Sequence, residues 1–165
     1  MTARQENATL RAVAAQWLRY ERHCILIACE RVPCTWLGIP DVFAMTARRT
    51  VIEIEIKRTM ADFRANSRKR CIVHRDGRHD ITPEQFYFLA PRSLAPSLVD
   101  LMPKGYGLLM PSSRVSRFTG LPLLVCLRPA MKQNPSKVLT MREIVRLLKA
   151  QSGTLVSALA KVSKQ

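Results

Sequence analysis

Two short stretches decide the fold of this chain: PDVFA at residues 40–44 and VIEIEIK at residues 51–57. Both alternate apolar residues with other residues, which predicts two β-strands with one buried face each. In the second stretch the three isoleucines share one face, while Glu53, Glu55 and Lys57 share the other. The sequence therefore predicts two carboxylates and an ammonium side by side on one face of a sheet.

The polar segment between the two stretches predicts an antiparallel hairpin with its turn centred near Arg48. Residues directly opposite each other in such a pair have side chains on the same face, so Asp41 is expected across from Glu55. A register shifted by one residue would set Asp41 opposite Ile54 and put a carboxylate in the core. Two facing carboxylates repel each other by roughly 0.2–1 kcal/mol, and a divalent cation between them would reverse the sign.

Hard oxygen ligands beside a lysine indicate a particular chemistry. Carboxylates suit Mg2+ or Mn2+ attached to a phosphate, and the lysine can orient or activate a water molecule. This combination of residues is typical of a site that cleaves phosphodiester bonds.

Pro40-Asp41 followed by Glu55-Ile56-Lys57 resembles the PD-(D/E)XK signature of the restriction-endonuclease-like nucleases. Three further segments are TMADFRAN at residues 59–66, FYFLAP at residues 86–91 and GYGLL at residues 105–109. With them, the chain is similar to the MmcB-like group of bacterial and phage proteins, whose members are associated with DNA repair. The similarity extends over roughly residues 20–115, most of a minimal domain of this class.

The resemblance implies an α/β fold with a restriction-endonuclease-like core, a central mixed β-sheet flanked by helices. The length of 165 residues fits one domain, spanning residues 1–165. The resemblance also implies that Asp41 and Glu55 bind Mg2+ or Mn2+, with the Ile56 carbonyl as a further ligand. Lys57 would orient the attacking water and stabilise charge on the transition state. The expected function is that of a metal-dependent deoxyribonuclease, an endonuclease in DNA repair, recombination or phage DNA processing.

Two other glutamates lie close to this motif. Glu30 follows an apolar run, and a carboxylate at the end of a buried strand needs a partner, which is either the metal or an arginine such as Arg31. Glu53 is expected to be a rim residue or a salt-bridge partner, because the two-residue offset to Lys57 selects Glu55 as the motif glutamate.

The balance of charge points to nucleic acid. The chain has 27 lysines and arginines against 12 acidic residues, a formal net charge of +15, which favours polyanions and salt-dependent binding. A helix is expected to start at the capping-box pair Thr59 and Asp62 and to run to about Arg70. It carries four cations that are expected to contact the DNA backbone rather than read bases, although a solvated basic face is the alternative: Arg64, Arg68, Lys69 and Arg70.

The composition indicates the class of protein and its expected location in the cell. An apolar fraction of 47% is typical of a globular protein, and no apolar run approaches the roughly 18 residues of a membrane span. Five cysteines without a C-x-x-C pair argue against a disulfide framework, and the N-terminus has no signal-peptide pattern. The expectation is a soluble protein that does not bind membranes, in the cytoplasm of a bacterium or a phage-infected host.

Two alternative functions remain open. One is a nucleic-acid-binding accessory protein that does not cleave, since binding needs the basic residues but not the carboxylates. The other is a branched-DNA (Holliday junction) resolvase, which would act as a homodimer with two cleavage centres.

The other expected elements follow from apolar periodicity and capping signals. They are a helix from Asn7, as its cap, to about Arg22; strands at 24–32, 86–90, 106–110 and 121–127; a short helix at 94–102; and a helix at 141–151 opened by Thr140 and Glu143. The strand at 86–90 is expected to pair parallel with the strand at 51–57, because a helix connects them.

Overall fold

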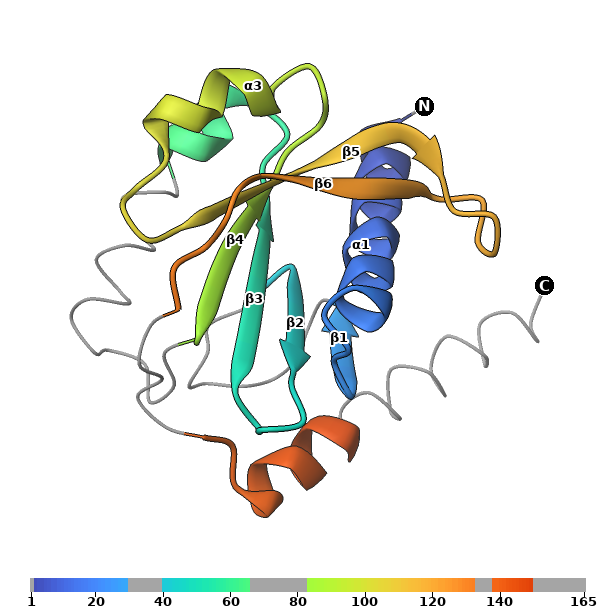
Figure 1. Cartoon of the computed structure of the whole chain (residues 1–165), viewed down its shortest axis with the longest axis vertical. Helices are drawn as coiled ribbons and strands as arrows, with labels where there is room; N and C mark the ends of the chain where they lie inside the picture. Colours follow the sequence, from blue (N-terminus) through green and yellow to red (C-terminus); the bar gives the residue numbers. More distant parts are fainter. Residues whose placement is uncertain (1, 30–39, 66–82, 133–137, 150–165) are drawn as a thin grey trace.

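A computed structural model of the chain describes residues 2–29, 40–65, 83–132 and 138–149. Its centre is a six-stranded sheet whose strands lie side by side in chain order (Figure 1). The strands are β1 (Leu26–Cys29), β2 (Val42–Met45), β3 (Val51–Ile56), β4 (Gln85–Leu89), β5 (Gly107–Val115) and β6 (Pro122–Arg128). The pairs β3–β4 and β4–β5 are parallel and the other three are antiparallel. The predicted class, an α/β fold with a central mixed sheet flanked by helices, is confirmed.

The hairpin of β2 and β3 has the predicted register. Val42 lies opposite Ile54 and Ala44 opposite Ile52, so one step further Asp41 lies opposite Glu55. The turn closes through a 2.7 Å hydrogen bond between the Thr46 and Thr50 hydroxyls. The alternation of apolar residues therefore predicted the pairing correctly, because a shift by one residue would have set Asp41 on the isoleucine face.

Helix α1 (Ala3–Tyr20) covers the isoleucine face of β3. Its apolar stripe is buried, as the spacing predicted: Leu10, Val13, Ala14, Trp17 and Leu18. The helix starts earlier than expected, because Thr2 and Gln5 form a reciprocal capping box in place of a cap at Asn7. In the described part of the chain, no helix has the length and apolar character needed to cross a bilayer.

The opposite face of the sheet is covered in two places. Residues 141–149 are helical, and with Leu139 they pack on Phe43 and Met45. Residues 60–65 are also helical, and with α3 (Ala95–Leu98) they pack on the β4 aromatics. Figure 1 shows α3 at one end of the strands and helix 141–149 at the other. Because both faces are covered, Glu53 is fully buried, and the expectation of a rim position for it was wrong.

Several local predictions are confirmed. Thr59 accepts the Asp62 N–H at 3.1 Å, and Thr140 forms a capping box with Glu143. The short helical segment at 94–102 is present as α3 and a 3-10 turn, η1 (Val99–Leu101), with Pro96 in its first turn.

Strand β5 runs further than the sequence indicated. It continues through Pro111 to Val115, beyond the predicted end at residue 110, and forms a hairpin with β6. An irregularity in the register between Pro111 and Val115 accommodates the proline, which lacks the N–H that a regular ladder requires. The β5–β6 hairpin is the longest two-stranded feature of the described chain.

Three of the five cysteines lie in the described part of the chain. Cys24, Cys29 and Cys126 are free thiols, and Cys24 is buried in the core beside α1. Burial raises the pKa of the Cys24 thiol to about 11, so the group stays protonated at neutral pH. Cys24 therefore acts as a small core residue rather than a reactive one.

Candidate active site

Lys57 is the buried centre of the site. It directly follows β3, and its side chain is only 1% exposed. Its backbone N–H donates to the Leu89 carbonyl at 2.9 Å. The Nζ atom lies 3.2 Å from Glu55 Oε1 and 3.7 Å from Asp62 Oδ1. A buried ammonium needs such partners, because an isolated charge in the interior is costly. Its position is consequently fixed from both the strand and the following helix.

Asp41 lies where β2 begins, and its carboxylate ties the two strands together. Its Oδ2 accepts the N–H of Ile56 at 2.9 Å, and Arg11 Nη2 of α1 lies 3.5 Å from its Oδ1. The N–H and C=O of one residue in a strand point to the same side of that strand, so the Ile56 carbonyl also faces Asp41. The Asp41 carboxylate and the Ile56 carbonyl therefore lie at the same end of the β2–β3 pair.

The donor set fits a magnesium ion. Asp41 and Glu55 each lie beside a cation, Arg11 and Lys57 respectively. Mg2+ typically keeps several waters and uses one or two carboxylates, so two carboxylates and one carbonyl are sufficient. Within the described ranges no three histidine, cysteine or acidic side chains form a metal cluster.

The predicted residues divide into two groups. The β2–β3 hairpin brings together Asp41, Glu55, Ile56 and Lys57. Arg64 is exposed on helix 60–65, directly after the site. Glu30, Arg68, Lys69 and Arg70 lie outside the described residues, so their predicted roles remain predictions.

Two residues of the site were missed from the sequence. Asp62 was interpreted only as part of a capping box, yet its side chain also reaches Lys57. Arg11 carried no signal, since it is one of several cations on the polar side of α1, thirty residues before its partner Asp41. The five-residue spacing between Lys57 and Asp62, across the strand-to-helix turn, was the clue available for the first of them.

The comparisons with known proteins bear on the fold alone. No family model matches the chain, and no curated protein matches it. Among solved structures it is similar to the SPO1766 protein of unknown function from Silicibacter pomeroyi, with 20% identity and a TM-score of 0.57. The match covers 92% of this chain and 87% of the other. The two chains share an α/β architecture over nearly their whole length.

Proposed function

We propose that this protein is a metal-dependent deoxyribonuclease, an endonuclease of the PD-(D/E)XK class that uses Mg2+ or Mn2+. The observation that carries the proposal is the buried Lys57 ammonium, which lies 3.2 Å from Glu55. Asp41 lies opposite Glu55 at the same end of the β2–β3 hairpin. The resemblance to the MmcB-like group suggests a role in DNA repair, recombination or phage DNA processing. A role on chromosomal or phage DNA would require a cytoplasmic location.

Each residue then has a defined task. Asp41, Glu55 and the Ile56 carbonyl would hold the metal ion, which when bound supplies Lewis-acid stabilisation of the phosphate. Lys57 orients the attacking water and stabilises the charge that develops on the phosphate oxygens. Asp62 is a second partner of Lys57, so the position of the ammonium does not depend on Glu55 alone. Arg64 would bind the DNA backbone beside the site.

The proposal is tested by incubating the protein with supercoiled plasmid, single-stranded circle and a branched duplex. Cleavage is expected with Mg2+ or Mn2+ and is expected to stop with EDTA. Preference for the branched duplex by a dimer would favour the resolvase alternative. Intact substrates that nevertheless shift in a low-salt gel would contradict the proposal and favour a binding protein that does not cleave.

Arg11 is expected to weaken metal binding, because a cation 3.5 Å from Asp41 competes with the metal ion for the same carboxylate. An Arg11→Gln variant should therefore bind Mn2+ about two- to fivefold more tightly, in keeping with the modest strength of partly exposed ion pairs. Calorimetric titration with Mn2+ in the absence of DNA measures this directly. The control is Arg49→Gln, in the turn at the other end of the β2–β3 hairpin. It also removes one positive charge, and it should leave the affinity for Mn2+ unchanged. Equal or weaker Mn2+ affinity in Arg11→Gln would contradict the prediction.

A further inference from the structure

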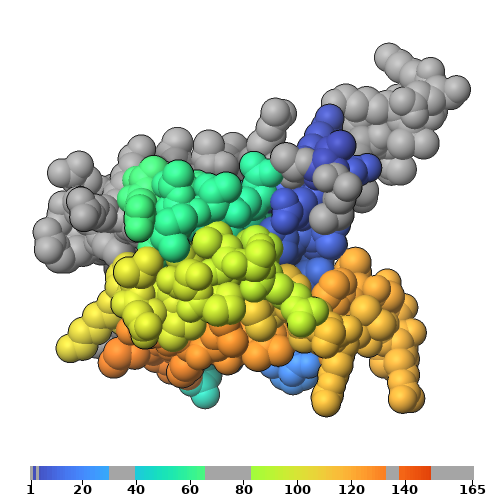
Figure 2. All heavy atoms as spheres, turned by 90° about the horizontal axis from the view of Figure 1, so that it is seen from above, coloured from blue at the N-terminus to red at the C-terminus, as the bar shows by residue number. Residues whose placement is uncertain are grey.

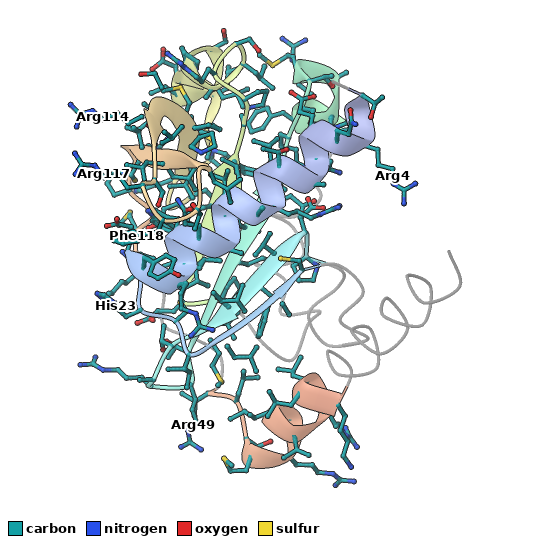
Figure 3. The ribbon with its side chains drawn as sticks, turned by 90° about the vertical axis from the view of Figure 1, so that its right-hand side faces the viewer. Arg4, His23, Arg49, Arg114, Arg117 and Phe118 are labelled. Carbon is teal, nitrogen blue, oxygen red and sulfur yellow. The ribbon has the colours of Figure 1, made fainter. Side chains whose placement is uncertain are left out.

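The tip of the β5–β6 hairpin, residues 112–121, displays an aromatic side chain to solvent. Phe118 is 96% exposed, more than any other large apolar residue in the described chain. Figure 3 shows Arg114 and Arg117 on the same side of the molecule, with both side chains directed outward. Within the described part of the chain neither arginine is seen paired with a carboxylate. The tip therefore combines an uncovered ring with two uncompensated cations.

The tip is a built structure with a defined conformation. The N–H of Ser116 donates to the Leu121 carbonyl at 2.8 Å, and the N–H of Gly120 donates to the Ser116 carbonyl at 2.9 Å. Gly120 has a φ of 68°, which a glycine adopts without strain. The Phe118 N–H donates to the Ser116 hydroxyl at 3.3 Å. These bonds fix the backbone that carries the ring, so little conformational entropy is lost when the ring meets a partner.

The hairpin is also attached to the body of the protein. The Thr119 hydroxyl bonds the Gln16 side chain of α1, and Gln16 Nε2 lies 3.5 Å from the Pro122 carbonyl. Figure 2 shows the gold tip standing out from the body beside the blue helix α1. The ring is thus held away from the core at a fixed place.

The charge of the chain segment that contains the tip indicates the chemistry of the partner. Between Asp100 and Glu143 the sequence contains seven lysines and arginines and no acidic residue. The cations are Lys104, Arg114, Arg117, Arg128, Lys132, Lys137 and Arg142. A chain segment of this composition favours a polyanion over a second copy of this basic chain. An exposed ring on the same side of the molecule as two guanidinium groups (Figure 3) matches the way proteins hold single-stranded nucleic acid, with bases stacked on aromatics and phosphates on cations.

We infer that the β5–β6 tip is a second DNA contact, in which Phe118 stacks on an unpaired base while Arg114 and Arg117 bind the neighbouring phosphates. The inference rests on the proposed function for the identity of the partner and adds the class of substrate: DNA that has a single-stranded segment. A duplex offers no free base face to the ring except at its ends, so the tip favours unpaired strands.

The test is fluorescence anisotropy of a labelled single-stranded oligonucleotide and of the same sequence as a duplex, with the full chain in EDTA so that nothing is cut. Phe118→Ala is expected to weaken single-strand binding by about 5- to 100-fold, the range found for a stacked base, and to affect the duplex much less. Phe118→Trp should retain the affinity, while Phe118→Leu, which is apolar but not aromatic, should not.

The arginines are tested by salt dependence. The double variant Arg114→Gln/Arg117→Gln should lower the slope of log K against log salt for the single strand by about 1.4, which corresponds to two phosphate contacts. Arg49→Gln removes one arginine charge at a place away from Arg114 and Arg117 in Figure 3, and this control should leave the slope unchanged.

The outcomes separate this inference from the nuclease proposal. Metal-dependent cleavage together with unchanged single-strand binding in Phe118→Ala would overturn the role of the tip and leave the nuclease intact. If the wild-type protein cuts no substrate and Phe118→Ala weakens single-strand binding, the nuclease proposal is overturned and the role of the tip in DNA binding is supported. If Phe118→Ala instead alters the oligomeric state or binding to anionic vesicles, with DNA affinity unchanged, the tip is a surface for another partner and the inference is wrong.

Discussion

Replacing Lys57 with methionine is expected to lower metal-dependent DNA cleavage by about 10²- to 10³-fold, the typical cost of losing one group that stabilises developing charge. Methionine has nearly the length of lysine and fills the same buried space, because the lysine stem is only 1% exposed. What disappears is the ammonium that lies 3.2 Å from Glu55. The measurement is the single-turnover rate of plasmid nicking at saturating Mn2+.

Two controls make the result specific. Arg58→Met removes the neighbouring cation, which is exposed, and should leave the rate within a few-fold of wild type. Circular dichroism and urea unfolding of Lys57→Met should report a folded protein, less stable by about 1–3 kcal/mol because Glu55 and Asp62 lose this cation. A folded Lys57→Met protein that cuts at the wild-type rate would show that the lysine has no catalytic role.

Replacing Gly107 with alanine is expected to destabilise the protein by about 3 kcal/mol, at the upper end of the usual cost of inserting a methyl group into a packed core. Gly107 opens β5 directly opposite Tyr87 of β4. An added Cβ would collide with the Tyr87 ring and would lie 2.7 Å from the Ala130 backbone nitrogen. The Tyr87 ring cannot move freely, because it packs edge-on against Trp17 with ring centroids 5.3 Å apart.

Urea denaturation provides the measurement, as a shift of the midpoint with the slope unchanged. Gly120→Ala is the matched control: its Cβ would meet nothing within 4 Å, and the cost is only the positive φ, about 1–2 kcal/mol. In a Tyr87→Leu background the penalty at Gly107 should shrink, because the colliding ring is gone. Equal penalties at Gly107 and Gly120 would mean that steric overlap is not the cause.

The β2–β3 hairpin shows how much of the fold local sequence patterns can predict. Alternation along residues 51–57 predicted both the strand and its register, because a shift of one residue moves every side chain to the wrong face. The facing of Asp41 and Glu55 followed from this pattern, and the adjacent Lys57 proved to be held by Glu55. The capping residues Thr59 and Thr140 were found for the same reason, since a cap is a contact within three residues.

The burial of Glu53 and the full length of β5 could not be predicted from local sequence patterns. The alternation of β3 suggested one open face, yet helices from distant parts of the chain cover both, and Glu53 is fully buried. The continuation of β5 past Pro111 depends on pairing with β6, which outweighs the local preference of a Ser- and Pro-containing segment for a loop.

By itself, the sequence determined the β2–β3 hairpin, its register, and the grouping of Asp41, Glu55 and Lys57, because these are set by periodicity and steric rules that act over a few residues. Only the tertiary structure decided that Arg11 would meet Asp41, that Asp62 would share Lys57, and that Phe118 would stand uncovered at a hairpin tip. Such contacts depend on how whole elements pack across the sheet, and packing is a property of the assembled core rather than of any local pattern.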